Sequence, residues 1–393
     1  MDVGLVGKPN VGKSTFFNAA TRADVEMASY PFTTIDANKG VGYVRAPCPH
    51  KELDVDCDPN NSPCMDGVRM IPVNIIDVAG LVPDAHSGKG LGNKFLDDLR
   101  QASTLIHIVD VSGSTDEKGE PCKVGNHDPV EDVEFLDKEI DHWIKGILEK
   151  NWQKVSRRLE VTGGKLEKVI YNQLSGLGVK ESNVIKALNA SEMPEQVRKW
   201  DDDDLFRLAS NLRKMTKPMM VAANKSDMAP EENIRSLEEL EYIVQPTSAE
   251  YELALRKASE KDLVRYIPGE ETFEIIGEDM SEVQVDALGK IKKFMKKNGG
   301  LGVQECLERA VYELLDMIVV YPVENEHNYT DKNGRVLPDA YLVKNGSTAE
   351  ELAFQVHSDI GEGFIRAIDA RTDRVIGRNH ELNDGDIIKI VTK

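Results

Sequence analysis

The chain has 393 residues, of which 40 % are hydrophobic, so it can bury the cores of two or three domains. Its formal net charge of -19 argues against binding nucleic acid with the whole surface, although a local basic patch stays open. No stretch approaches the roughly 20 apolar residues of a membrane helix, and the N-terminus lacks the pattern of a secretory signal. We therefore expect a cytoplasmic protein that does not enter a membrane.

The first region alternates predicted strands and helices. Four apolar runs predict strands buried on both faces, at residues 3–6, 70–76, 105–109 and 219–223. Such runs are typical of a parallel sheet covered by helices, and residues 39–45 add a predicted edge strand. The pattern predicts a doubly wound α/β domain that binds its ligand at the carboxyl ends of the strands.

Residues 128–215 interrupt this alternation with apolar residues at helical spacing, broken near Gly163 and Gly176. We expect an inserted helical arm whose apolar stripes face each other, and a role as a partner-docking lever is compatible with that packing. The acidic run at residues 201–204 is expected to cap the following helix rather than bind a metal.

The C-terminal region predicts a small α+β module with one helix packed on a sheet. A strand is expected at residues 319–323, a capping box from Ser347 to Glu350, and a final strand after a turn at residues 384–386. The predicted division is 1–127 and 216–316 for the two parts of the α/β domain, 128–215 for the arm and 317–393 for the module.

A phosphate-binding loop follows the first predicted strand. The sequence matches GxxxxGKS and precedes a predicted helix, whose N-terminus favours an anion. Lys13 is expected to neutralise the β- and γ-phosphates, and the Ser14 hydroxyl to bind Mg²⁺. The predicted phosphate-binding residues are Gly7, Lys8, Pro9, Asn10, Val11, Gly12, Lys13, Ser14 and Thr15.

A DxxG motif follows the second buried strand. Asp77 is expected to hold Mg²⁺, and the Gly80 N–H to bind the γ-phosphate. Thr33 and Thr34 lie where a first switch segment is expected, and one of their hydroxyls should reach Mg²⁺. The sequence leaves open whether Thr34 or Thr33 does so.

An NKSD motif at residues 224–227 ends the fourth buried strand and predicts guanine recognition. The Asp227 carboxylate can accept hydrogen bonds from the guanine N1–H and N2 amine, donors that adenine lacks, and a buried carboxylate left unpaired is costly. Lys225 is expected to cover the base, Asn224 to tie the loops together, and the Ala249 N–H to donate to O6. The predicted base-binding residues are Asn224, Lys225, Asp227, Ser248 and Ala249.

These motifs, in this order, predict a P-loop GTPase. Asn10, the YPFTT stretch at residues 30–34 and the glycine-rich stretch at residues 86–96 resemble the Obg family of GTPases, most closely its YchF/Ola branch. The resemblance covers essentially the whole chain. It implies a P-loop NTPase G domain, an inserted helical arm and a C-terminal, β-grasp-like TGS domain. Much of that branch has an altered base-reading motif and favours ATP, whereas the intact NKSD of this chain favours GTP.

The resemblance also implies a partner. The family that this chain resembles is linked to translation and associates with ribosomes. Its TGS domain is thought to contact RNA or regulatory ligands. Four arginines in this region could bind phosphates, with solvated surface residues as the alternative: Arg366, Arg371, Arg374 and Arg378.

Hydrolysis needs an oriented water and charge neutralisation at the γ-phosphate. Leu81 stands where Ras-like enzymes have a glutamine and cannot orient water, so we expect slow intrinsic turnover. His86 is one candidate for help, and Asn10 is another, because in related GTPases an asparagine here helps to bind K⁺. Lys13, Asn10 and His86 are thus the predicted catalytic residues. The alternatives are an RNA-binding nucleotide sensor with little turnover, or an ATPase.

Cys48, His50, Cys57 and Cys64 fall within one short segment. Four such ligands can form a tetrahedral zinc site. The spacing lacks the paired C-x-x-C of zinc knuckles, so ordinary loop cysteines are expected, with zinc as the alternative.

Overall fold

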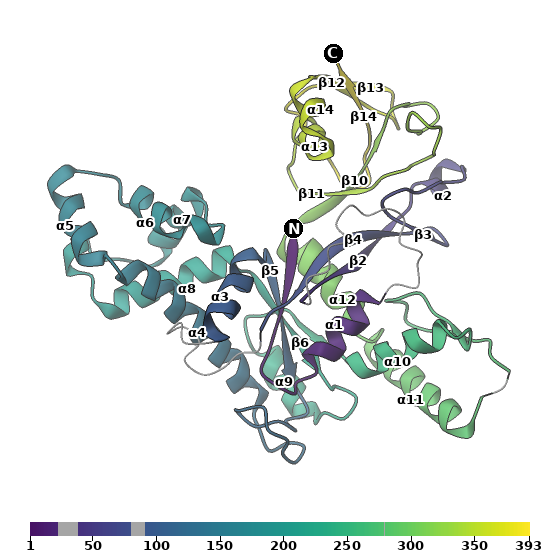
Figure 1. Ribbon diagram of the computed structural model, residues 1–393, viewed down its shortest axis with the longest axis horizontal. Helices are drawn as coiled ribbons and strands as arrows, with labels where there is room; N and C mark the ends of the chain where they lie inside the picture. Colours follow the sequence, from purple (N-terminus) through teal and green to yellow (C-terminus); the bar gives the residue numbers. More distant parts are fainter. Residues whose placement is uncertain (23–37, 80–90, 279) are drawn as a thin grey trace.

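The computed structural model describes residues 1–22, 38–79, 91–278 and 280–393 (Figure 1). Its central sheet has the order β2-β4-β1-β5-β6-β7, with β2 antiparallel to β4 and the other neighbours on this path parallel. The strands are β1 (Asp2–Val6), β2 (Lys39–Pro47), β4 (Val68–Asp77), β5 (Thr104–Asp110), β6 (Met219–Asn224) and β7 (Val244–Pro246), and the short β3 (Cys64–Met65) pairs with β4. The four predicted buried strands and the edge strand are confirmed.

Helices cover both faces of this sheet. One face packs on α1 (Lys13–Thr21) and α12 (Val303–Glu308), which continues into a π-helix (Arg309–Leu314). The other face packs on α3 (Leu91–Gln101) and on the helical arm. The sheet is therefore buried on both sides, as its apolar strands require.

The arm leaves the sheet after β5 and returns to β6. Its helices are α4 (Pro129–Glu149), α5 (Trp152–Thr162), α6 (Leu166–Leu174), α7 (Glu181–Ala190) and α8 (Asp202–Thr216), which extend to the left in Figure 1. Their apolar stripes share one core with the sheet face, which confirms that they face each other. Asp201 caps α8 by accepting a hydrogen bond from the Asp204 N–H at 3.0 Å, so the capping role of the acidic run is also confirmed.

A unit that the sequence did not reveal lies between β7 and α12. It contains α10 (Ala249–Ser259), the strand pair β8 (Val264–Arg265) and β9 (Glu274–Ile275), and α11 (Glu282–Asn298). These elements enclose their own apolar core. α11 projects away from the sheet on the side opposite the arm (Figure 1). The helix α9 (Glu231–Glu238) packs against β5 and β6 of the central sheet, at the bottom of the view in Figure 1.

The C-terminal module has a sheet of order β11-β10-β14-β12-β13, in which β10 and β14 are parallel. Its strands are β10 (Met317–Val323), β11 (Tyr341–Lys344), β12 (Phe364–Asp369), β13 (Arg374–Ile376) and β14 (Ile387–Thr392). Two short helices follow β11, α13 (Ala349–Val356) and α14 (Ser358–Glu362), so the expectation of one helix was wrong.

The predicted capping box of this module was displaced by one residue. Thr348, rather than Ser347, caps α13: its hydroxyl accepts from the Glu351 N–H at 3.3 Å, and the Glu351 carboxylate accepts from the Thr348 N–H at 2.9 Å. The Ser347 backbone is bonded within the preceding turn to Lys344, at 2.9 Å. The pairs Ser347/Glu350 and Thr348/Glu351 both have the S/T-x-x-E spacing of a capping box. Because the preceding turn already includes Ser347, the helix is capped by Thr348.

None of the helices in the described part of the chain is both long enough and apolar enough to cross a membrane.

Candidate nucleotide site

A cavity of about 530 Å³ opens at the carboxyl ends of β1 and β6, a volume typical of small-molecule sites. Segments more than 200 residues apart in the chain meet there. Its lining residues are Lys8, Pro9, Asn10, Gly12, Lys13, Ser14, Thr15, Asn224, Lys225, Asp227, Met228, Ser248 and Glu250. The structure thus places most of the predicted phosphate-binding and base-binding residues around one cavity, and it adds Met228 and Glu250.

Two glycines shape the phosphate loop. Gly12 has a φ of 94°, and a Cβ at this position would collide with Asn224 Nδ2. A Cβ at Gly7 would lie only 2.6 Å from the Ile108 carbonyl oxygen. The loop can therefore approach β5 and β6 closely only because these positions lack side chains, and it curls directly into α1.

Lys13 and Asp77 form an ion pair at the floor of the loop. Asp77 is the last residue of β4, and the Ser14 hydroxyl is exposed at the start of α1. A hydroxyl and a carboxylate are the hard oxygen ligands that Mg²⁺ prefers, so these residues fit the expected ion. The other predicted switch and catalytic residues, namely Thr33, Thr34, Gly80 and His86, lie outside the described residues.

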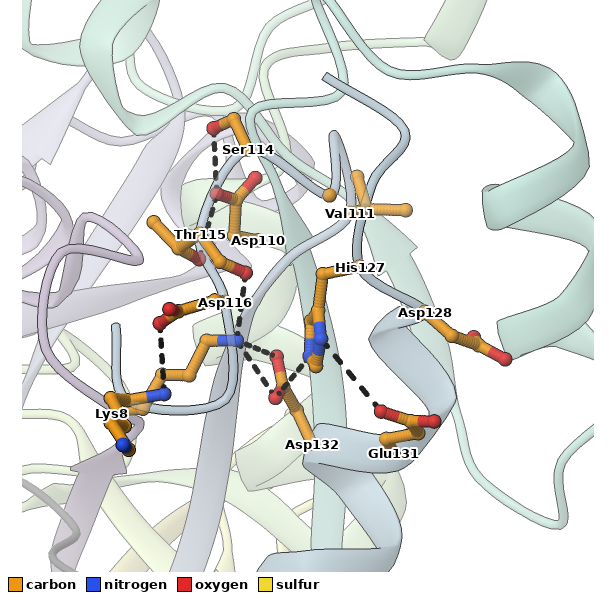
Figure 2. Close-up of polar contacts among 12 residues, drawn as sticks. Lys8, Asp110, Val111, Ser114, Thr115, Asp116, His127, Asp128, Glu131 and Asp132 are labelled. Atoms are coloured by element: carbon orange, nitrogen blue, oxygen red, sulfur yellow. Dashed lines mark hydrogen bonds and ion pairs between the residues drawn. The ribbon is translucent and has the colours of Figure 1, made fainter. Parts of the chain in front are cut away.

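Lys8 lines the cavity, and its ammonium group reaches Asp132 at the start of α4 (Figure 2). The buried Nζ lies 2.8 Å from the Asp132 carboxylate in the first turn of α4, and donates to the Thr115 carbonyl oxygen at 3.1 Å. His127 Nε2 lies 2.8 Å from the same carboxylate. A buried cation requires such partners, so the phosphate loop is tied to the base of the arm.

Asn10 extends the contact between the phosphate loop and the segment after β5. It adopts a φ of 64°, and its Nδ2 donates to the Gly119 carbonyl oxygen at 2.9 Å. Its amide oxygen Oδ1 is therefore the atom that could bind a cation, as a K⁺ site would require.

Asn224 connects the base-binding and phosphate-binding sides of the cavity, which confirms its predicted role in tying the loops. Its Nδ2 donates to the Val11 carbonyl oxygen at 2.8 Å, and its Oδ1 accepts from the Ala249 N–H at 3.0 Å. That N–H is the one predicted to donate to guanine O6, so in this structure it is already engaged. The Ser248 hydroxyl caps α10 by accepting from the Tyr251 N–H at 3.4 Å.

Lys225 is held by Asp110, which the sequence analysis missed. Lys225 Nζ lies 2.8 Å from the buried Asp110 carboxylate, which also accepts from the Ser114 and Thr115 hydroxyls. Burial raises the pKa of Asp110, but the hydrogen bonds from Lys225 and from the Ser112 hydroxyl outweigh it and leave the pKa below its ordinary value. The available signal was an aspartate directly after the apolar run at residues 105–109.

Asp227 lies at the rim of the cavity and is exposed. The sequence argument assumed a buried carboxylate, but the turn after β6 carries this side chain into solvent. The expected discrimination between bases would therefore depend on how far a bound base covers this carboxylate.

The C-terminal arginines do not act as one group. Arg371 pairs with Glu52 of α2 (His50–Leu53), and Arg378 lies 2.8 Å from Glu350. Arg366 and Arg374 are exposed on β12 and β13. Two of the four candidate phosphate contacts are thus already matched by carboxylates.

A glycine-shaped phosphate loop, a DxxG aspartate at the end of β4 and an NKSD turn after β6 define a P-loop GTPase. Three family models match this chain: a 50S ribosome-binding GTPase at residues 2–155, an Obg-like GTPase YGR210-like, G4 motif-containing domain at residues 222–325, and a TGS domain at residues 326–392.

The chain is similar to whole proteins as well. An uncharacterized GTP-binding protein of Methanocaldococcus jannaschii is 54 % identical over 99 % of this chain and 98 % of its own length. The crystal structure of a GTP binding protein from Pyrococcus horikoshii covers 100 % of both chains with 44 % identity and a TM-score of 0.79. The ribosome-binding ATPase YchF of Haemophilus ducreyi is 28 % identical over 98 % of this chain and 97 % of its own. This chain belongs to the Obg-like GTP-binding proteins.

Proposed function

We propose that this protein is a cytoplasmic molecular switch that binds and hydrolyses GTP and acts on the ribosome. The preference for guanine rests on one observation, namely that the NKSD turn at residues 224–227 is held in a fixed position. Asn224 is bonded to both sides of the cavity and Lys225 to Asp110, so the turn that holds Asp227 stands at a set position beside the phosphate loop. A carboxylate there matches the N1–H and N2 amine of guanine and faces the N1 acceptor of adenine unfavourably.

A nucleotide titration tests the choice of base. GTP, ATP and xanthosine triphosphate are titrated against the wild type and Asp227→Asn. The wild type should prefer GTP, and the variant should lose roughly 100-fold in GTP affinity, as expected for hydrogen bonds to a charged group worth about 3 kcal/mol. Because xanthine has a carbonyl in place of the N2 amine, the amide introduced by the substitution can donate to it, and affinity for that nucleotide should rise.

The matched control is Glu250→Gln, another acidic residue of the same cavity, which should leave the GTP preference unchanged. Wild-type protein that binds ATP as tightly as GTP would instead favour the ATPase alternative suggested by the name of the Haemophilus relative.

Turnover is expected to depend on Lys13, Asn10 and His86, and on Mg²⁺ held by Ser14, Asp77 and one of the two switch threonines. K⁺ should stimulate hydrolysis through Asn10, so the rate in K⁺ should exceed that in Na⁺, and Asn10→Ala should remove the difference. Single-turnover assays with and without ribosomes separate the switch from the RNA-binding sensor. Absence of hydrolysis in both conditions would favour the sensor.

The arm is proposed to report the nucleotide state. Lys8 follows Gly7 in the phosphate loop, and its side chain ends on Asp132 at the start of α4 (Figure 2). A shift of the loop on binding a triphosphate would therefore act directly on the arm, whose α4 and α8 share the core of the sheet.

α11 is proposed as the ribosome-binding surface. Its apolar side contains Leu288, Ile291 and Met295, and exposed lysines occupy the opposite side. These lysines are Lys290, Lys292, Lys293, Lys296 and Lys297. In a chain of net charge -19, a basic helix that projects from the molecule is suited to phosphate contacts. Lys290 and Lys297 pair with carboxylates, as two of the C-terminal arginines do, so Lys292, Lys293 and Lys296 are the proposed phosphate contacts.

Co-sedimentation with ribosomes tests this surface. Substituting Lys292, Lys293 and Lys296 by glutamate should weaken binding at least tenfold and flatten its dependence on salt, because fewer counterions are released. The control substitutes Arg366 and Arg374 by glutamate. A larger loss in the control would move the proposed surface to the TGS domain.

A further inference from the structure

We propose that Cys48, His50, Cys57 and Cys64 bind one structural Zn²⁺ ion that fixes the segment on which the TGS domain docks. The four residues come from separate places: the end of β2, the start of α2, the following loop and β3. The fold nevertheless brings their ligand atoms within 4.8 Å of one another.

The distances match a tetrahedral metal site. Ligands at the zinc–sulfur and zinc–nitrogen bond lengths lie about 3.5–3.8 Å apart at the corners of a tetrahedron. His50 Nδ1 lies 3.3 Å from Cys57 Sγ and 3.5 Å from Cys64 Sγ, and Cys48 Sγ lies 4.0 Å from Cys57 Sγ. Core cysteines that merely fill space have no reason to gather around an imidazole nitrogen. The absence of a C-x-x-C spacing argued against zinc, but here a turn and the strand β3 bring the ligands together instead.

The donor set selects the metal. Three thiolates and one imidazole are soft or borderline ligands, which favour Zn²⁺ over Mg²⁺ or Ca²⁺. Four protein ligands leave no open position, so the site is structural rather than catalytic.

The neighbouring Arg69 supports a charged centre. Its side chain is fully buried, and it donates to the Ser62 and Leu337 carbonyl oxygens, while its Nε has no hydrogen-bond partner. Within the described residues it forms no ion pair with a carboxylate, although buried charges normally have one. Zn²⁺ with three thiolates and a neutral histidine has a net charge of -1, which would compensate this guanidinium.

The metal would hold the contact between two domains. Residues 58–61, between two of the cysteines, bond to the TGS domain through backbone groups and through the side chains of Asn60 and Asn61. The Asp58 N–H donates to the Val336 carbonyl at 2.9 Å, the Asn60 N–H to the Pro338 carbonyl at 2.6 Å, and the Ala340 N–H to Asn61 Oδ1 at 2.9 Å. The segment at residues 48–66 contains only a four-residue helix and a two-residue strand, so a zinc ion would fix its shape.

Metal analysis of the full-length chain, expressed with zinc and purified without chelator, tests the proposal. We expect one zinc per chain in the wild type, a loss of most of it in Cys57→Ser, and full retention in Cys122→Ser, a free cysteine far along the chain from this segment. Protein without stoichiometric metal, with iron instead of zinc, or with a Cys48–Cys57 disulfide would overturn the assignment.

Cobalt substitution guards against a variant that fails to fold. Wild-type chain stripped of metal and titrated with Co²⁺ should develop the visible absorption bands of a tetrahedral thiolate site at one equivalent. Stripping should also speed hydrogen exchange at the Asp58, Asn60 and Ala340 N–H groups, which donate across this contact, and zinc should reverse it. A titration without such bands, or exchange that does not respond to zinc, would count against the site.

Discussion

The G domain meets its two appended units through junctions of different chemistry. At the arm, a cation from the phosphate loop, Lys8, is buried against Asp132 of α4. At the TGS domain, residues 58–61 bond to residues 336–340 through two backbone hydrogen bonds and through the side chains of Asn60 and Asn61, next to Arg69 and the cysteine cluster. The first junction begins beside the nucleotide, and the second lies at the amino end of β4, whose carboxyl end carries Asp77.

This difference indicates how the two units can respond. The hydrogen bonds of residues 58–61 start outside the lining of the nucleotide cavity, whereas the Lys8–Asp132 ion pair begins in the phosphate loop and changes when the loop does. We expect the arm to sense the nucleotide and the TGS domain to stay docked. Four substitutions test whether the two junctions differ in this way.

The largest effect is expected from Arg69→Ala at the TGS junction. The substitution leaves a cavity and two buried carbonyl oxygens, of Ser62 and Leu337, without donors. The free energy of unfolding should fall by about 4 kcal/mol. Chemical denaturation measures this loss, and GTP affinity should change little. Arg69→Lys, which keeps a cation and most of the side-chain volume, should lose less, and an equal loss would mean that filling space is not what Arg69 contributes.

A smaller effect is expected from Asp132→Asn at the arm junction. The amide keeps the shape but leaves Lys8 buried without an anion, which should cost about 2 kcal/mol of stability and roughly tenfold in GTP affinity. Thermal unfolding and nucleotide titration measure the two effects. The control is Glu131→Gln on the same turn, whose exposed carboxylate lies 3.8 Å from His127. If Asp132→Asn leaves GTP affinity intact, the arm does not sense the phosphate loop through Lys8.

Asp110→Asn probes the cavity beside the arm junction, because Asp110 accepts from the hydroxyl of Thr115, whose carbonyl oxygen accepts from Lys8. The pKa of Asp110 is lowered in the fold, so its contribution to stability is complete above the unfolded-state pKa and is lost as pH falls through the lower folded-state pKa. The variant should lose about 1–2 kcal/mol near pH 7 and show a shallower decline of stability below about pH 4. Denaturation at several pH values measures this decline. An unchanged acid slope would show that Lys225 is held by other groups.

The sequence predicted the parts of the site that a short motif contains. Gly12, Lys13 and Asn224 are recognisable because the phosphate loop and the base-binding turn each need fixed residue types at fixed spacing, and the strand before each motif is an apolar run. The fold class followed from those same runs.

Contacts between distant segments could not be predicted in this way. The partner of Lys8 lies 124 residues along the chain, and nothing local to either residue marks the pair. The cysteine cluster shows the same limit, since its geometry depends on β3 returning to β4 rather than on spacing. The α10–α11 unit was missed because its strands have only two residues each, too short for a period to be visible.

The smallest effect is expected from Glu52→Gln, which removes the ion pair with Arg371 at the edge of the TGS junction. Glu52 is 65 % exposed, so solvent screens the pair and the loss of stability should stay below about 0.5 kcal/mol. Arg371→Ala should cost more, because Arg371 also donates to the Gly385 carbonyl oxygen at 3.1 Å. Denaturation of both variants and of the double variant separates the two contributions. If Glu52→Gln alone accounts for the cost of Arg371→Ala, the TGS junction depends on an exposed charge, and the contrast with the arm is one of burial rather than of chemistry.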